Sequence, residues 1–123
     1  MSTTYCGNLF LGTPIKLNHF VIEGEWTPAM LKASAIYDKS PDVLWNEIHN
    51  DGDNCLGDGL GIYFFDGEPY LGTIVARSMS DDASHSAEIS LPEATATFAK
   101  VQGLMDNLSV NKPARMFVVM DWF

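Results

Sequence analysis

The residues best suited to chemistry lie in one loop, from Asp51 to Gly61, which combines carboxylates with glycines. Carboxylate oxygens bind calcium, and an EF-hand loop places its ligands at alternating positions and ends on a bidentate glutamate at position twelve. Asp51 and Asp53 fit the first two ligand positions, but Cys55 stands where an oxygen is required and Ile62 occupies the twelfth place. The loop therefore departs from an EF-hand, and we expect it to bind calcium no more tightly than about 1 mM.

The same loop is rich in glycine, as are loops that bind nucleotide phosphates. Such loops lie between a strand and the N-terminus of a helix. Gly57, Gly59 and Gly61 lead into a predicted strand instead, which argues against phosphate binding. The pattern favours a connecting loop in which glycine supplies positive φ and Asp or Asn supplies local turns. An irregular cation site built from the loop oxygens stays open as an alternative.

Other side chains capable of catalysis or metal binding are scattered along the chain. A transition-metal site needs several His or Cys brought together, whereas His19, His49 and His85 are far apart in sequence. We interpret His19, which has apolar neighbours, as a packed and hydrogen-bonded side chain. The segment 77–86 contains Ser, His and Asp, but no nucleophile-elbow pattern surrounds its serines. The sequence therefore predicts no catalytic residue, no metal and no cofactor.

Length and composition are typical of one globular domain, 1–123. The chain has 123 residues, of which 46% are hydrophobic. Two cysteines, Cys6 and Cys55, are too few for a disulfide framework, so we expect free thiols. No apolar run reaches the roughly 18 residues of a membrane-spanning helix, and the first residues lack the features of a secretory signal. We therefore expect a cytoplasmic protein that does not contact membranes.

The charges are distributed unevenly along the chain, whose formal net charge is −9. Residues 40–99 carry eleven acids and one base, a balance of −10, while residues 1–39 balance at 0 and residues 100–123 at +1. Residues 40–76 contain seven of these acids and no Lys or Arg. Such a surface repels nucleic acid and anionic membranes and attracts basic proteins or cations. Plain solubility is the alternative explanation, because net charge concerns association and not a specific role.

These observations favour a non-enzymatic binding or inhibitory module that acts on a basic protein surface. Nucleic-acid-mimicking inhibitors, immunity proteins and phage counter-defence proteins share its small size and acidity, an analogy of properties alone. Acids would accelerate encounter with the partner, and buried aromatics would supply most of the binding energy. The alternative is a small enzyme or ligand-binding domain with its site at the Asp51–Gly61 loop. The candidate binding residues are Trp45, Asp51, Asp53, Asp58, Tyr63, Asp66, Glu68 and Tyr70.

Local signals predict three helices. Thr27-Pro28 and Ser40-Pro41 each place a hydroxyl N-cap before a proline, and Ser90 opens a capping box that Glu93 completes. The third helix carries apolar residues at spacings of three and four, which predicts one buried face. We expect Phe98 to lie at the centre of that face, so that Phe98→Ala would cost about 3–5 kcal/mol. The residues of the stripe are Leu91, Ala94, Phe98, Val101, Met105 and Leu108.

Strand signals complete the predicted fold. Leu60–Phe65 and Tyr70–Ala76 flank Asp66-Gly67, a pair typical of hairpin turns, and the first of these strands is apolar on both faces, as a central strand would be. Arg77–Ser86 is polar and predicts an exposed loop. The order of elements predicts an α+β fold, a small antiparallel or mixed sheet with two to three helices packed on one face. The remaining predicted strands are Tyr5–Leu11, Ile15–Ile22 and Arg115–Phe123.

Overall fold

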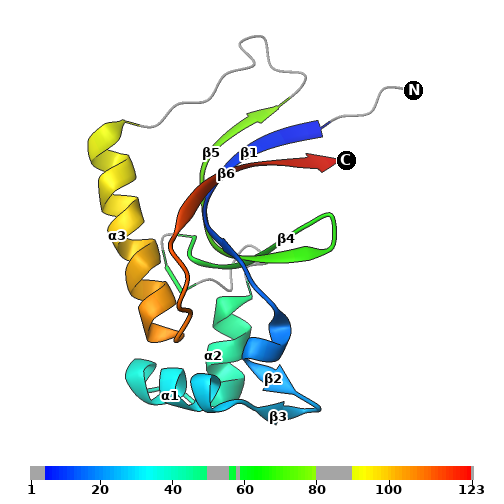
Figure 1. Cartoon of the computed structure of the whole chain (residues 1–123), viewed down its shortest axis with the longest axis vertical. Helices are drawn as coiled ribbons and strands as arrows, with labels where there is room; N and C mark the ends of the chain where they lie inside the picture. The colour runs from blue at the N-terminus through cyan, green and yellow to red at the C-terminus, as the bar shows by residue number, and fades with distance from the viewer. Residues whose placement is uncertain (1–4, 50–55, 58, 80–89, 123) are drawn as a thin grey trace.

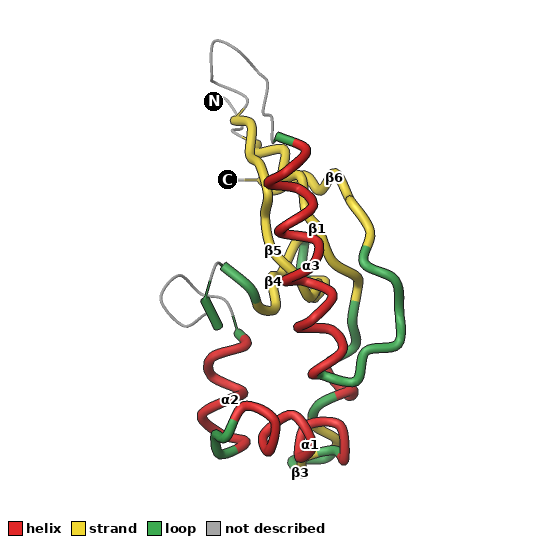
Figure 2. The backbone as a smooth tube through the Cα atoms, turned by 90° about the vertical axis from the view of Figure 1, so that its left-hand side faces the viewer, coloured by secondary structure: helices red, strands yellow, loops and turns green. Residues whose placement is uncertain are grey.

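The computed structural model describes residues 5–49, 56–57, 59–79 and 90–122, and its architecture is α+β, as predicted. Four antiparallel strands form a curved sheet in the order β4-β5-β1-β6, and two short strands, β2 and β3, form a separate hairpin. Helix α3 lies along one face of the sheet, and α1 and α2 lie at one end (Figure 1). The side view shows α1 crossing beneath the end of α3 (Figure 2). The strands are β1 (Tyr5–Pro14), β2 (Val21–Ile22), β3 (Glu25–Trp26), β4 (Gly61–Phe65), β5 (Glu68–Met79) and β6 (Arg115–Trp122), and the helices are α1 (Pro28–Tyr37), α2 (Pro41–Ile48) and α3 (Leu91–Asn107).

All three α-helices begin where their capping signals predict. The side-chain oxygens of Thr27, Ser40 and Ser90 accept hydrogen bonds from the backbone N–H groups three residues later, each at 3.3 Å. These bonds satisfy donors that the first turn of a helix otherwise leaves without a partner. None of the three helices is long and apolar enough to cross a membrane.

The predicted strand Ile15–Ile22 is wrong for most of its length. Leu17–His19 forms a turn of 3-10 helix, and only the last two residues are extended, as β2. The His19 ring donates a hydrogen bond through Nε2 to the carbonyl oxygen of Leu108 at 2.8 Å, and the Thr27 hydroxyl donates to the His19 carbonyl at 2.6 Å. Contacts with residues distant in sequence therefore override the strand propensity of this stretch. The interpretation of His19 as hydrogen-bonded is confirmed.

The hairpin predicted at Asp66-Gly67 is confirmed. Asp66 has φ 54° and Gly67 has φ 79°, the pair of positive values that a type I′ turn requires. Strands β4 and β5 pair on either side of this turn, from Phe65 opposite Glu68 outward.

Two details of the hairpin strands differ from the prediction. Strand β4 is an edge strand and not a central one, and β5 continues to Met79, so that Arg77 lies in a strand and not in a loop. Residues 80–86 of that predicted loop lie outside the described residues. An edge strand is apolar on both faces here because the sheet bends. Ile62 joins the core beneath the helices, while Phe65 packs on Phe10 on the opposite face, with ring centroids 5.5 Å apart.

We expect Gly67→Val to lower the free energy of unfolding by roughly 1 kcal/mol or more, because β-branched residues rarely adopt positive φ. No atom lies within 4 Å of an added Cβ at Gly67, so the loss would come from backbone strain and not from a clash. Thermal or urea unfolding measures it. Gly24→Val is the matched comparison, since Gly24 has φ 78° and equally open surroundings. A melting curve unchanged by Gly67→Val would contradict the turn geometry.

A row of glycines crosses three strands at the bend of the sheet. Gly72 of β5 pairs with Gly12 of β1 on one side and with Gly61 of β4 on the other. The backbones of β1 and β5 approach so closely that a Cβ added to Gly12 would lie 1.9 Å from the carbonyl oxygen of Leu71. Glycine inside a strand marks such close approaches and bends. The row lets the sheet curve strongly, as the paths of β1 and β5 show (Figure 1).

The bend separates the hydrophobic side chains into two clusters. The larger cluster lies between the sheet and the helices, with Phe20, Met30 and Leu44 among its fully buried members. The second, which we call the aromatic cluster, lies on the other face of the sheet around Phe10, which is fully buried. Edge-to-face contacts with centroids 5.4–6.0 Å apart join its members. They are Phe10, Tyr63, Phe65, Tyr70 and Phe117.

The prediction that Phe98 is buried is wrong, because its side chain is 45% exposed. Val101 and Met105 of the same stripe are fully buried, so the stripe faces the core only in the second half of α3. Beside the first half an open groove of about 320 Å³ remains, lined by Phe98 of α3 and Met116 of β6. Helical periodicity predicts the direction of an apolar face but not the length over which other elements cover it.

Candidate functional site

The acidic residues predicted to bind a partner fall into two groups in the structure. Asp51, Asp53 and Asp58 lie outside the described residues. Asp66 and Glu68 are exposed at the tip of the β4-β5 hairpin, in the turn and directly after it. The tip of this hairpin is therefore the described part of the chain in which predicted acidic residues are exposed to solvent.

The two predicted tyrosines lie next to each other on the same hairpin. Tyr63 and Tyr70 are opposite one another in the β4-β5 register, and both are half-buried. Their rings contact Phe10 with centroids 5.4 and 5.8 Å away, and the Tyr63 hydroxyl donates to the carbonyl oxygen of Gly59. Both rings thus hold the hairpin against the rest of the sheet and present only part of their surface to solvent.

The β2-β3 hairpin is a second acidic hairpin, which was not predicted from the sequence. Glu23 and Gly24 have φ 52° and 78°, nearly the values of the β4-β5 turn, and they join β2 to β3. Glu25 follows directly and is exposed, as is Glu23. The available signal was a repeated triplet of acid, glycine and glutamate, at residues 23–25 and again at 66–68. The charge balance of the segment does not reveal it, because residues 1–39 are neutral as a whole.

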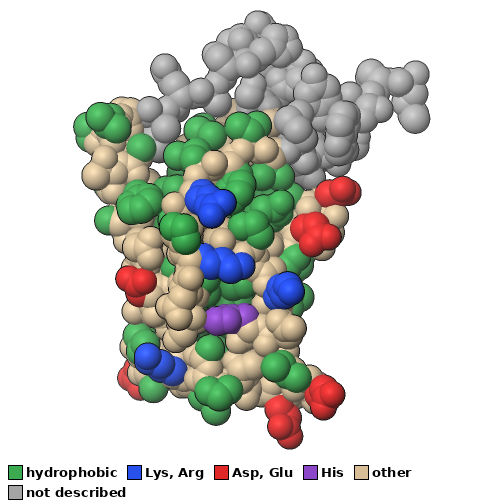
Figure 3. Space-filling model, viewed as in Figure 1, with side chains coloured by type: hydrophobic (Ala, Val, Ile, Leu, Met, Phe, Trp, Pro, Cys, Tyr) green, Lys and Arg blue, Asp and Glu red, His purple; other side chains and the backbone are tan. Residues whose placement is uncertain are grey.

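The two acidic hairpins project from the same side of the molecule. Both turns lie at the right-hand side in Figure 1, and acidic side chains appear at two heights along that edge in Figure 3. We call their four exposed carboxylates the acidic hairpin pair: Glu23, Glu25, Asp66 and Glu68.

A chain of ring contacts connects the two hairpins. Trp26 of β3 contacts Trp45 of α2 with centroids 5.9 Å apart, Trp45 contacts His49 at 4.1 Å, and His49 stacks on Phe64 of β4 at 6.2 Å. The Nδ1 atom of His49 donates to the Trp45 carbonyl at 2.8 Å, which fixes the ring. Phe64 is 46% exposed and the other three residues are half-buried. We call these four residues the aromatic run; it places the predicted Trp45 between the two acidic tips.

Basic side chains gather on the adjacent face, and one of them lies near the same right-hand edge, between the two acidic heights (Figure 3). One cavity of about 550 Å³ is lined by Lys16, His19 and Lys112, and a neighbouring one of about 340 Å³ is lined by Lys112 and Arg115. Lys and Arg side chains with a histidine among them lie over the middle of the face shown in Figure 3. The charges of the protein are therefore distributed unevenly over its surface, with a basic region on a chain whose net charge is strongly negative. The sequence did not reveal this because these bases come from the segments before β2 and after α3.

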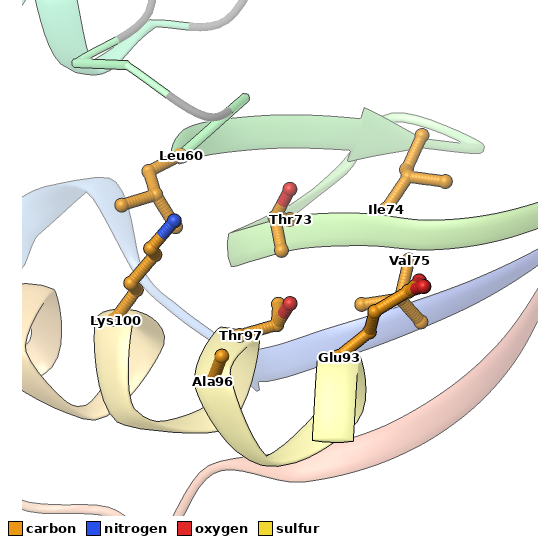
Figure 4. A pocket seen from close by; sticks show the side chains of 8 residues that line it. All are labelled: Leu60, Thr73, Ile74, Val75, Glu93, Ala96, Thr97 and Lys100. Atoms are coloured by element: carbon orange, nitrogen blue, oxygen red, sulfur yellow. The ribbon is translucent and has the colours of Figure 1, made fainter. Parts of the chain in front are cut away.

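A third cavity lies between α3 and β5 and has a volume of about 380 Å³. Thr73 of β5 and Thr97 of α3 lie on its two sides, with the Thr73 oxygen directed away from Thr97, while Glu93 and Lys100 extend along its opposite ends (Figure 4). Leu60, the residue before β4, also lines this cavity. The lining places the Thr97 side chain between one carboxylate and one ammonium group, which suits a small polar molecule better than acid–base catalysis.

No family model, curated protein or solved structure matches this chain. Among the residues that the structure describes, no three His, Cys, Asp or Glu side chains gather in a way that could hold a metal ion. The case for a function therefore depends on the surfaces of the chain itself.

Proposed function

We propose that this protein is a non-enzymatic module that binds a basic protein, and inhibits it by occupying its surface. The observation that carries the proposal is the acidic hairpin pair, whose two tips project from one side and are joined by the aromatic run. Four carboxylates without a basic residue in either turn attract a cationic surface, and a single hairpin would present only two of them.

The two parts of this surface have different tasks. The exposed carboxylates accelerate encounter, and salt screens their attraction over about 8 Å at physiological ionic strength. Binding energy concentrates in a few aromatic side chains that become fully buried in the complex. Phe64 and Trp45 suit that role, because Phe64 is 46% exposed and the His49 ring, which contacts both side chains, connects it to the half-buried Trp45.

A small-molecule site is the second candidate, and the cavity between α3 and β5 is the observation that favours it. A cavity lined by both a histidine and a carboxylate would support acid–base catalysis. Among the residues that the structure describes, the cavity beside α3 is lined by Glu93 but by no histidine, and the basic cavity is lined by His19 but by no carboxylate. Ligand binding at the α3 cavity thus stays open, while the arrangement of groups favours a binding module over an enzyme.

We expect that neutralising all four hairpin carboxylates lowers the association rate constant for the partner by a factor of at least about ten at low salt. Its association rate should also depend less on salt, because fewer charges remain to be screened. The partner is first isolated by pull-down from the native host or a competitor of that host, at low and high salt. Stopped-flow or surface-plasmon measurements over a series of salt concentrations then give the rates. The substitutions are Glu23→Gln, Glu25→Gln, Asp66→Asn and Glu68→Gln.

A second quadruple variant controls for net charge. It removes four exposed carboxylates that lie on or beside the helices, so its net charge equals that of the hairpin variant. We expect it to retain most of the association rate of the wild type. Equal slowing in both variants, or in neither, would contradict a role for the hairpin pair. The control substitutions are Asp38→Asn, Asp42→Asn, Glu93→Gln and Asp106→Asn.

A further inference from the structure

Strand β6 is an edge of the sheet, and within the described residues it is hydrogen-bonded to a neighbouring strand, β1, on one side only. It is eight residues long, whereas the opposite edge strand, β4, has five. Natural edge strands are commonly protected by charges, prolines or short length. Positions 116–120 of β6 contain none of these protections, since they are all Met, Phe or Val. The curl of the sheet brings β4 into contact with β6, but the two strands are not paired among the described residues, so the unpaired edge of β6 still lacks these protections against pairing with another strand.

Exposed hydrophobic side chains surround this edge. Val118 is 76% exposed and Met116 45% exposed, on the face of β6 that looks toward α3. Leu91 and Phe98, in the first half of α3, are exposed as well, and the open groove described above separates Phe98 from Met116. Hydrophobic side chains lie together over this part of the molecule in Figure 3. Single exposed hydrophobic residues are ordinary, but a contiguous group of them marks an interaction surface.

The sequence of β6 is complementary to itself in antiparallel orientation. If Val118 lies opposite Val118 of a second copy, then Met116 lies opposite Met120 and Phe117 opposite Val119. Arg115 then lies opposite Asp121 at both ends of the paired segment. Opposite charges in cross-strand positions stabilise a pair, and like charges destabilise it. This register combines an apolar centre with two complementary charge pairs, which points to a second copy of the chain as the occupant of the edge.

We propose that the protein forms a symmetric dimer in which the two β6 strands pair antiparallel, with the two-fold axis between the Val118 residues. The two sheets of four strands then become one continuous sheet. Because the axis is perpendicular to the sheet, both α3 helices lie on the same face, and their exposed residues Leu91 and Phe98 flank the joined β6 strands. The acidic hairpin pair takes no part in this contact, so the dimer neither requires nor excludes the proposed function.

Analytical ultracentrifugation of the wild-type chain from low to high micromolar concentration tests the dimer. We expect the average mass to rise to twice that of the monomer and to stop there. In Val118→Lys two ammonium groups would meet at the axis, and we expect a monomer with an unchanged far-ultraviolet circular dichroism spectrum. Val43→Lys is the matched control, because Val43 is 47% exposed on α2, away from the edge. It should dimerise like the wild type.

A charge exchange tests the register even where Val118→Lys fails to fold. Arg115→Glu or Asp121→Arg alone places like charges opposite each other twice per dimer and should weaken dimerisation roughly tenfold. The double variant Arg115→Glu/Asp121→Arg restores both pairs and should recover the wild-type dissociation constant. The proposal would be overturned if the wild-type chain stays monomeric or assembles without limit. It would also be overturned if the Val118→Lys variant folds and still dimerises. Failure of the double variant to recover would overturn the register.

Discussion

Gly72→Ala is expected to cost at least about 3 kcal/mol of unfolding free energy, at or beyond the upper end of typical overpacking losses. An added Cβ at Gly72 would lie 2.0 Å from the carbonyl oxygen of Leu11 and 2.8 Å from the Cα of Gly12. Real Cβ atoms do not approach other atoms so closely, and both neighbours belong to the backbone, which cannot rotate away as a side chain can. Strands β1 and β5 would have to separate where the sheet bends. Urea unfolding followed by circular dichroism measures the loss, and Gly12→Ala should behave alike.

Gly103→Ala is the matched control for this prediction. Gly103 lies inside α3, is exposed, and has no atom within 4 Å of an added Cβ. Alanine is a better helix former than glycine by about 1 kcal/mol, so this variant should gain stability. The same substitution is thus expected to have opposite signs at two glycines of one chain. A Gly72→Ala protein within about 1 kcal/mol of the wild type would show that the strands can accommodate a Cβ at this point.

The elements that sequence reasoning predicted correctly depend on local contacts. A type I′ turn needs positive φ at Asp66 and Gly67, and the Ser90 cap needs only a backbone N–H three residues later, at Glu93. Such preferences act within four residues of the chain. The glycine row could not be predicted in the same way. Gly12 and Gly72 are sixty positions apart, and only the β1-β5 register shows that they share one close approach.

The candidate site was predictable in composition but not in arrangement. Acids at Asp66 and Glu68 were identified from the charge balance, and Trp45 was identified as an aromatic residue near them. That Glu23 and Glu25 belong to the same side of the molecule follows from the placement of β2 and β3, which no property of residues 1–39 indicates. The aromatic run likewise joins three elements that are separate in sequence. Charge and residue type are read from sequence; adjacency is set by the tertiary fold.

Phe10→Ala is expected to lower the unfolding free energy by about 3–5 kcal/mol, the range of large-to-small substitutions at buried aromatic residues. Phe10 is fully buried, and the rings of Tyr63, Phe65 and Tyr70 surround it with centroids 5.4, 5.5 and 5.8 Å away. Its removal would leave a cavity that these rings cannot fill, because β4 and β5 hold them in register. Urea unfolding measures the loss of unfolding free energy. A weaker near-ultraviolet circular dichroism signal should report looser packing of the aromatic rings.

Phe98→Ala provides the comparison that separates burial from residue type. Phe98 is 45% exposed, so its truncation removes little contact area and leaves no closed cavity. We expect a loss of less than about 1 kcal/mol when the protein is dilute enough to be monomeric, well below the loss predicted for Phe98 from helical periodicity. The contrast between two phenylalanines tests whether the face of the sheet opposite the helices is a true second core. Equal losses at both positions would show that the aromatic cluster contributes no more to stability than a half-exposed ring on α3.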